Sequence, residues 1–328
     1  ISEIAAIAGV SATTVSLVIN GRAEAYRISE KTQKKILDIV KKTNYVPDQY
    51  ARGFRLQKTQ TIGLIVPDLR NWFFSQISYE IESLARQDAY QVLIACSDDN
   101  EEKELKLIHN LHARRIDALI IASVMENDRI VEDILRLDIP VVFIDRRIES
   151  KNVSWVSSDN HQGAFTLTDH MCKKGLRRIA FFGGLESIST SKNRLRGFRD
   201  ALEHNSLVFD PTIVFQKDYT LAAGYEMAEC VFANESVEID GIFTGSLPLL
   251  EGTLKYMWNH ARQTSKPIMI GTFDDHPFLD YLSIRIPSIR QNTVKLAERA
   301  FDMINEMIRG KKVAKHEVVE PELIIREN

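Results

Sequence analysis

The amino-acid sequence predicts two regions of different fold class: an all-α head and an α/β body composed of two doubly wound parallel-sheet lobes. Three observations support this prediction. Residues 1–58 combine short helical patterns with an excess of basic side chains. From Thr61 onward, short β-rich apolar runs alternate with amphipathic helices, and this alternation breaks around Asp145 to Ser158, which divides the body into two similar halves.

These changes of pattern predict the domain boundaries. We expect the head at residues 1–46, a hinge helix and linker at 47–60, and the body at 61–328. Within the body we expect lobes at about 61–157 and 158–288, with residues 289–328 returning across both lobes. A chain of 328 residues has room for these domains, since a single domain typically takes ~100–200 residues.

Composition indicates a globular protein of the cytoplasm. Apolar residues make up 44% and charged residues 27%, as in folded soluble domains. The three widely spaced cysteines, Cys96, Cys172 and Cys230, suit a reducing compartment better than a disulfide framework. No apolar run approaches the ~18 residues of a membrane span, and no charged and apolar leader opens the sequence. We therefore expect neither secretion nor membrane contact.

Net charge is distributed unevenly along the chain. The whole sequence carries −3, which by itself argues against a nucleic-acid partner. Residues 1–58, however, hold ten Lys and Arg against five Asp and Glu, which gives +5, and residues 59–328 carry the remaining −8. The positive segment is the place to look for phosphate contacts.

Three helices are predicted in the head. The first ends at Gly9, Ser11 caps a second helix from Ala12 to Ile19, and Ser29 caps a third that runs to about Lys42. Two short helices joined by a tight Gly turn and backed by a third form the helix-turn-helix plan, although any small three-helix domain also fits.

The head resembles a known family of bacterial transcription regulators. The matching residues are Ile4-Ala5, Ala8-Gly9-Val10-Ser11, Thr14-Val15-Ser16 and Val18-Ile19-Asn20-Gly21, followed by Asn44-Tyr45, Pro47 and Ala51-Arg52. This ordered set resembles the lactose and galactose repressor (LacI) family. The resemblance implies a protein that binds operator DNA and whose DNA affinity a small molecule controls.

Candidate DNA contacts follow from the resemblance. It places Ala12, Thr13 and Leu17 at base edges, where Thr13 can hydrogen-bond and the other two offer apolar contact. Ser11, Thr14, Ser16, Asn20 and Tyr45 are interpreted as phosphate contacts or packing residues. The family more often has long polar side chains at the first and last base-reading positions, so the operator sequence is not readable from this chain.

The hinge carries a candidate DNA wedge. In the family an apolar hinge side chain enters the minor groove at the centre of the site, and the matching position here is Phe54. Arg52 and Arg55 are placed to meet the DNA backbone. A flexible linker with a chance aromatic residue is the alternative interpretation.

The body elements alternate along the sequence. The predicted strands are Ile62–Val66, Val92–Cys96, Ala118–Ala122, Val141–Ile144, Ile179–Phe182, Ile213–Phe215, Gly241–Phe243 and Ile268–Gly271, with helices near 74–88, 101–115, 128–137, 161–174, 190–205, 221–233, 248–262 and 293–309. Two such lobes leave a cleft at the carboxyl ends of their strands, where ligands bind in parallel sheets. The resemblance implies the same architecture, the periplasmic sugar-binding fold.

Several body segments resemble one branch of the family, the sucrose-operon and fructose repressors. They include Ile62-Gly63-Leu64-Ile65-Val66-Pro67-Asp68, Phe182-Gly183-Gly184, Asn193-Arg194-Leu195-Arg196-Gly197-Phe198 and Thr272-Phe273-Asp274-Asp275-His276. This resemblance implies a repressor of a sucrose or fructose utilisation operon, acting as a homodimer on a near-palindromic site. A sugar-binding receptor and another effector-responsive regulator, purine-responsive or dual activator and repressor, are the alternatives.

A sugar site needs an aromatic face for the ring and charged or amide groups for the hydroxyls. The resemblance places the aromatic contacts at Trp72, Phe73 and Tyr219 and the charged contacts at Arg194 and Asp274, with Asp68, Asp145, Arg146 and Gln291 as weaker candidates. Structural roles compete: Trp72 and Phe73 as core, Tyr219 as a surface cap, Asp274 as a turn cap. Arg146 and Arg194 together suit a sugar phosphate, so fructose, fructose 1-phosphate and sucrose all stay open.

An enzyme is not expected. The sequence lacks the P-loop, nucleophile-elbow and zinc-protease motifs and any C-x-x-C pair. His109 and His112 share a helix face, yet no third metal ligand lies nearby in sequence. We therefore expect no cofactor and no metal.

Overall fold

The computed structural model describes residues 1–43, 45, 58–125, 132–134, 136–148, 150, 152–233, 238–260, 268–311 and 315–326. The chain forms two compact units, Ile1–Thr59 and Gln60–Asn328, which contain the head and the body. The hinge candidates Arg52, Phe54 and Arg55 lie outside the described residues, as does half of the helix expected at 128–137.

The head contains the three expected helices: α1 (Ser2–Ala8), α2 (Ala12–Ile19) and α3 (Glu30–Lys42). Gly9 ends α1 in the left-handed conformation, with a φ of 66°, and Ser11 caps α2 by accepting a hydrogen bond from the Thr14 amide. Helices α1 and α2 are bent by 102° relative to each other, which lies within the range of helix-turn-helix pairs.

Apolar side chains from all three helices form the head's core. It is built from Ile4, Ala5, Ala8, Val15, Val18, Ala23 and Ile36. Among the described residues, no single helix has the length and apolar composition needed to cross a membrane; α1 and α2 reach that length only when taken together across their bend.

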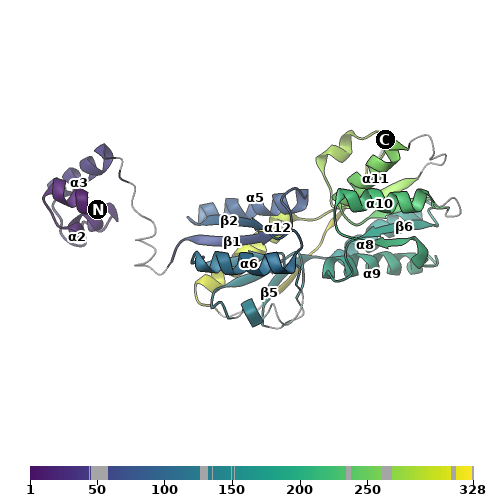
Figure 1. Ribbon diagram of the computed structural model, residues 1–328, viewed down its shortest axis with the longest axis horizontal. Coiled ribbons are helices and arrows are strands. Elements are labelled where there is room, and N and C mark those ends of the chain that lie inside the picture. The colour runs from purple at the N-terminus through teal and green to yellow at the C-terminus, as the bar shows by residue number, and fades with distance from the viewer. Residues whose placement is uncertain are drawn as a thin grey trace. The chain divides into compact units, whose positions relative to one another are not determined.

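The first lobe is built on a parallel sheet with strand order β11-β5-β4-β3-β1-β2. Its strands are β1 (Thr61–Val66), β2 (Gln91–Cys96), β3 (Ala118–Ile121), β4 (Val141–Ile144), β5 (Ser154–Ser158) and β11 (His316–Val319). Helices α5 (Trp72–Gln87) and α12 (Thr293–Ile308) pack on one face, and α6 (Glu101–Ala113) packs on the other (Figure 1). Successive β1 side chains alternate between these two cores.

The second lobe repeats this plan with strand order β12-β10-β9-β8-β6-β7. Its strands are β6 (Ile179–Gly183), β7 (Val214–Gln216), β8 (Gly241–Thr244), β9 (Met269–Phe273), β10 (Ser288–Arg290) and β12 (Glu322–Ile324). Helices α8 (Asn160–Lys173) and α9 (Ser189–His204) cover one face, and α10 (Leu221–Phe232) and α11 (Leu247–Asn259) cover the other (Figure 1). The fold class predicted from the sequence is therefore confirmed.

The chain passes between the lobes after β5, after β10 and after β11. As a result α12 packs in the first lobe although β10, which precedes it, belongs to the second. Each lobe therefore depends on segments that are distant in sequence.

The structure corrects the expected strands in three respects. Strand β5 lies in the segment expected to be a break, and β10, β11 and β12 were not expected, because none of these four contains more than two consecutive apolar residues and all are at most five residues long. Strand β12 pairs antiparallel with β10, so the second sheet is not wholly parallel. Ile213 belongs to a 3₁₀ turn, Pro211–Ile213, that Asp210 caps, and the strand begins one residue later.

Candidate functional site

The exposed face of α2 is the candidate DNA-reading surface. Ala12 and Thr13 are exposed in its first turn, and Leu17, one turn after Thr13, is half-buried. Ser11 Oγ and Thr14 Oγ1 are hydrogen-bonded to each other at 2.8 Å at the start of the helix. The first turn of α2 therefore presents small polar and apolar groups.

Other candidate DNA contacts in the head are tied to its fold. Ser16 is buried, and the Asn20 side-chain amide donates to its carbonyl oxygen at 2.7 Å. Tyr45 is half-buried against the head's core. Lys35 donates to the Ala8 carbonyl oxygen at 2.8 Å, which satisfies the end of α1, while Lys31, Lys34, Lys41 and Lys42 are exposed on α3.

A cavity of about 280 Å³ lies between the two lobes. Helix α5 of the first lobe lines it with Trp72, Phe73 and Gln76, and the rest of its lining is Asp274, Asp275, Pro277, Arg290, Gln291 and Thr293. Trp72, Phe73, Asp274 and Gln291 were candidates from the sequence. Aromatic, carboxylate and amide groups thus converge on one cavity of ligand size.

Asp274 is held in the wall by a strained backbone and a buried hydrogen bond. It follows β9 with a φ of 71°, and Gln291 Nε2 donates to its Oδ1 at 2.6 Å. Burial raises the pKa of this carboxyl above its usual range, although the Arg194 charge and hydrogen bonds from Gln291 and the Leu247 amide oppose the rise. The Gln291 Oε1 atom is buried with no hydrogen-bond partner among the described residues.

Arg194 supports this wall from behind and does not line the cavity. It is buried on α9, where its Nε donates to Asn160 Oδ1 at 2.7 Å and its Nη1 donates to the Gly245 carbonyl oxygen at 2.6 Å. Its guanidinium lies 3.7 Å from the centre of the Phe273 ring. These contacts fix the end of β9, from which Asp274 emerges.

Tyr219 also lies outside the cavity lining. Its hydroxyl and Ser191 Oγ are hydrogen-bonded at 2.9 Å, and its ring centre is 5.8 Å from the Arg194 guanidinium. The cap of the following helix is Thr220, so Tyr219 is not the cap residue.

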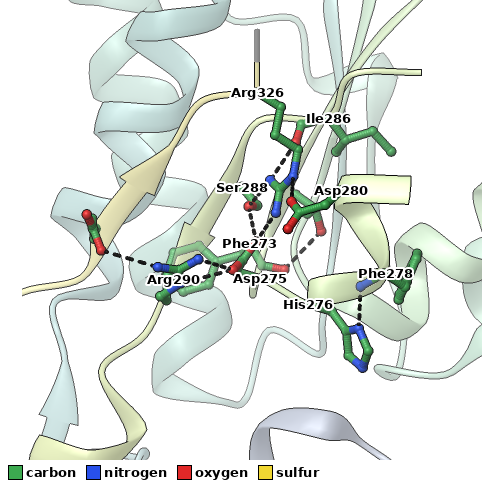
Figure 2. Close-up of polar contacts among 11 residues, drawn as sticks. Phe273, Asp275, His276, Phe278, Asp280, Ile286, Ser288, Arg290 and Arg326 are labelled. Atoms are coloured by element: carbon green, nitrogen blue, oxygen red, sulfur yellow. Dashed lines mark hydrogen bonds and ion pairs between the residues drawn. The ribbon is translucent and has the colours of Figure 1, made fainter. Parts of the chain in front are cut away.

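Trp72 makes a ring contact across the cavity. Its ring centroid lies 4.3 Å from that of His276 in the second lobe, at an angle of 57°. The Phe278 amide donates to His276 Nδ1 at 3.0 Å, which orients the imidazole (Figure 2). Burial lowers the pKa of His276, although the nearby Asp275 charge opposes this effect. Phe73, in contrast, belongs to the first lobe's buried core as well as to the cavity lining.

The remaining three candidates lie in the first lobe and do not line the cavity. Arg146 is buried and pairs with Asp99 at 2.6 Å, and Asp145 is buried beside it with a φ of 69°. Asp68 pairs with the exposed Arg70 at 2.9 Å. Partial burial raises the pKa of Asp68, but the hydrogen bonds and charge of Arg70 outweigh burial, so the pKa lies below its usual range.

Sequence reasoning missed five lining residues and one supporting residue. Gln76 lies one helical turn after Trp72, and Asp275, Arg290 and Thr293 flank candidates that were chosen, so helical spacing and neighbourhood could have found them. Pro277 had no such signal, and neither had Arg326, which supports the cavity wall by donating to Asp275 Oδ1 at 2.5 Å. Among the described residues, no cluster of three or more His, Cys, Asp or Glu side chains is placed to hold a metal ion.

Known protein families match both the head and the body of this chain. Residues 1–48 match the model of bacterial regulatory proteins of the lacI family, and residues 59–273 match that of periplasmic binding proteins and the sugar-binding domain of the LacI family. The chain belongs to the LacI family. It is therefore a DNA-binding transcription regulator with a sugar-binding domain, as the sequence predicted.

Curated LacI-family relatives match over nearly the whole chain. The sucrose operon repressor of Klebsiella pneumoniae is 34% identical over 94% of this chain and 92% of its own length. The fructose operon regulatory protein of Vibrio cholerae is 35% identical over 92% of this chain and 91% of its own length. These relatives are transcription regulators rather than enzymes.

Solved LacI-family structures share the fold. The Cra transcriptional dual regulator of Pseudomonas putida, in complex with fructose 1-phosphate, superposes with a TM-score of 0.76 at 27% identity, covering 82% of this chain and 99% of that one. The Lac repressor bound to ONPG superposes with a TM-score of 0.84 over 98% of this chain and 97% of that one. Its identity is 23%, so it shows the common fold alone.

Proposed function

We propose that this LacI-family member represses a sucrose or fructose utilisation operon and that a sugar or sugar phosphate bound between the lobes controls its operator affinity. The observation that carries the proposal is the cavity lined from both lobes by Trp72, Asp274 and Gln291. An aromatic face suits the apolar side of a sugar ring, and the carboxyl and amide suit its hydroxyls. The relatives named above regulate operons of these two sugars.

Control of DNA binding follows from a ligand that touches both lobes. Such a ligand favours whichever arrangement of the lobes brings Trp72 and Asp274 to it together, so it shifts the equilibrium between arrangements. The shift is a coupling free energy, and operator DNA must change sugar affinity by the same factor as sugar changes operator affinity. Equal sugar affinity with and without operator DNA would contradict this mechanism.

The DNA contacts are proposed on the exposed face of α2. Ala12, Thr13 and Leu17 would meet base edges, and Ser11 and Thr14 would meet phosphates at the start of the helix. In the hinge, Phe54 would enter the minor groove and the flanking arginines would meet the DNA backbone. Basic residues in the head supply the sequence-independent attraction.

We propose that the regulator acts as a homodimer, because one helix-turn-helix reads a half-site and a two-fold protein matches a palindromic operator. Exposed apolar side chains on α5 and on the edge strand β2 support this: Tyr79 is 62%, Ile94 41% and Leu93 37% exposed. Two copies double the net charge of +5 on residues 1–58, so operator binding should weaken steeply with added salt.

A single experiment tests the operator, the effector and the sign of regulation. The full chain selects bound sequences from a random DNA pool in the presence of sucrose, fructose, fructose 1-phosphate or no sugar. We expect a near-palindromic site whose recovery falls with at least one of the sugars. Recovery of random sequences only, or the same recovery in all four conditions, would contradict the proposal.

A dual role as activator and repressor is the second candidate. Catabolite repressor/activator proteins of Salmonella typhimurium and Escherichia coli are 31% identical over 93% of this chain. A reporter gene separates the two roles, because a dual regulator raises transcription from some operator positions and lowers it from others, whereas a repressor only lowers it.

A further inference from the structure

His276 is fixed in the second lobe, where the chain leaves β9 and enters the 3₁₀ turn η2 (Pro277–Tyr281). Its Nδ1 atom accepts a hydrogen bond from the Phe278 amide at 3.0 Å (Figure 2). Its carbonyl oxygen accepts one from the amide of Leu279, which is fully buried in the lobe's core. The Phe278 ring centroid also lies 4.8 Å from that of the imidazole. Hydrogen bonding and packing therefore hold the imidazole in one place.

Trp72 lies on the opposite wall and is the more exposed partner. It is the first residue of α5, is 37% exposed and lines the cavity. Its ring centroid lies 4.3 Å from that of His276, at an angle of 57°. This contact joins the two lobes, because α5 packs in the first lobe and His276 follows β9 of the second.

The position of the indole matters because a ligand that stacks on it must find it in place. A large, exposed side chain loses rotamer freedom when a ligand immobilises it, and this loss weakens binding. A neighbouring ring that already holds the side chain removes most of that cost before the ligand arrives. His276 is placed to do this for Trp72.

We propose that the neutral imidazole of His276 is a positioning residue for sugar binding, which holds the Trp72 indole in place as the aromatic face of the cavity. This inference rests on the proposed function, because it concerns the same sugar site. His276 acts through Trp72 and is not itself part of the cavity lining.

The hydrogen bond from the Phe278 amide requires the neutral form. An amide N–H can donate only to a ring nitrogen that carries no proton, and a charged imidazolium carries a proton on both nitrogens. Protonation would place two donors 3.0 Å apart, so the ring would have to turn away from its place against Trp72.

The surroundings of the imidazole favour the neutral form on balance. The charged side chains on the segments around it are Asp68 and Arg70 before α5, Asp274, Asp275 and Asp280 on its own segment, and Arg290 and Arg326. Asp275 favours the charged form, but Arg290 and Arg326 both donate to that carboxylate. Burial outweighs the Asp275 charge and lowers the pKa of His276.

Two substitutions separate the ring of His276 from its hydrogen bond. His276→Asn keeps an acceptor for the Phe278 amide but has no ring, whereas His276→Phe keeps a ring against Trp72 but has no acceptor. The full chain is titrated in a calorimeter at pH 7.5 with fructose, sucrose and fructose 1-phosphate. We expect His276→Asn to weaken sugar binding about threefold to tenfold, the scale of one aromatic ring contact, and His276→Phe to stay within about twofold of wild type.

His260→Asn is the matched control. His260 also stacks on an aromatic ring, that of Tyr256 at 4.2 Å, but it lies on the far side of α11 from no cavity-lining residue and should leave sugar affinity unchanged. Wild-type affinity in a folded His276→Asn protein, or an equal loss in His276→Phe or in His260→Asn, would overturn the inference and leave the proposed function intact. No binding of any of the three sugars to the wild type would refute the proposed function itself. Thermal unfolding confirms that each variant is folded.

The pKa of His276, read from its imidazole NMR signal in the full chain, provides a second test. Sugar that stacks on the held indole also favours the neutral imidazole, so saturating sugar should lower this pKa. By the same linkage, sugar affinity should fall as the pH drops through the pKa that His276 has in the free protein, and His276→Phe should not show this fall. A pKa that rises or stays unchanged on sugar binding would overturn the inference, because a role in folding alone predicts no shift.

Discussion

Replacing Arg194 by Met tests whether the buried polar cluster behind the cavity holds the second lobe's wall in place. Arg194 is 4% exposed and makes two charged hydrogen bonds, at 2.7 Å to Asn160 and at 2.6 Å to Gly245. Hydrogen bonds to charged groups stabilise by about 1.5–3 kcal/mol each, so the loss of both costs at least about 3 kcal/mol. We therefore expect Arg194→Met to lower the free energy of unfolding by about 3–5 kcal/mol.

Urea unfolding followed by circular dichroism measures this loss, which corresponds to a fall in the midpoint of roughly 1–2 M. Arg196→Met is the control, because Arg196 is exposed on the same helix, and it should change stability by less than about 0.5 kcal/mol. Equal stability of the Arg194 and Arg196 variants would refute the role assigned to Arg194.

At acidic pH, Arg194→Met should lower the free energy of unfolding by less than it does at neutral pH. Burial raises the pKa of Asp274 and the Arg194 charge opposes the rise, so the variant's Asp274 takes up a proton at a higher pH. A carboxyl whose pKa is raised in the folded state stabilises that state fully below its ordinary pKa near 4, and this contribution is lost as the pH rises. The stability difference between wild type and variant should therefore be smaller at about pH 5 than at about pH 7.5. A larger difference at the lower pH would contradict this reasoning.

Three further predictions concern the cavity, the second lobe's packing and the hinge. Trp72→Ala removes the ring contact across the cavity and should weaken sugar binding about tenfold or more in calorimetry, whereas Trp258→Ala, at an 84% exposed position, should not. Gly197→Ala places a Cβ 2.1 Å from a backbone oxygen of α8 and should destabilise the protein by at least about 1–3 kcal/mol in thermal unfolding. Phe54→Ala should weaken operator binding and reduce DNA bending in gel-shift assays.

Each of these has a contrary outcome. Unchanged sugar affinity in Trp72→Ala would show that the Trp72 ring does not contact the sugar. A Gly197→Ala protein as stable as its Arg196→Ala neighbour would show that α8 and α9 can separate without cost. Wild-type operator affinity and DNA bending in Phe54→Ala would show that Phe54 does not act as a wedge in the minor groove.

Helices and most strands could be predicted because their determinants are local. Ser11, Gly9 and Ser29 mark the ends of the head helices by capping or by left-handed geometry, and each does so in the structure. The body strands with four or more consecutive apolar residues were likewise found to within one or two residues. Strands β10 and β12 escaped prediction because three residues carry too little periodicity, and their formation depends on pairing with each other.

The sequence by itself determined the fold class and the family. Helix caps, apolar periodicity and ordered motifs depend on neighbouring residues, so they can be recognised without the tertiary structure. Only the tertiary structure decided that Asp275 lies between Arg290 and Arg326, which are 15 and 51 positions away along the chain. The physical reason is that Arg326 follows the antiparallel strand β12, which pairs with β10 after the chain has returned across both lobes. This pairing is set by tertiary packing, and no local pattern encodes it.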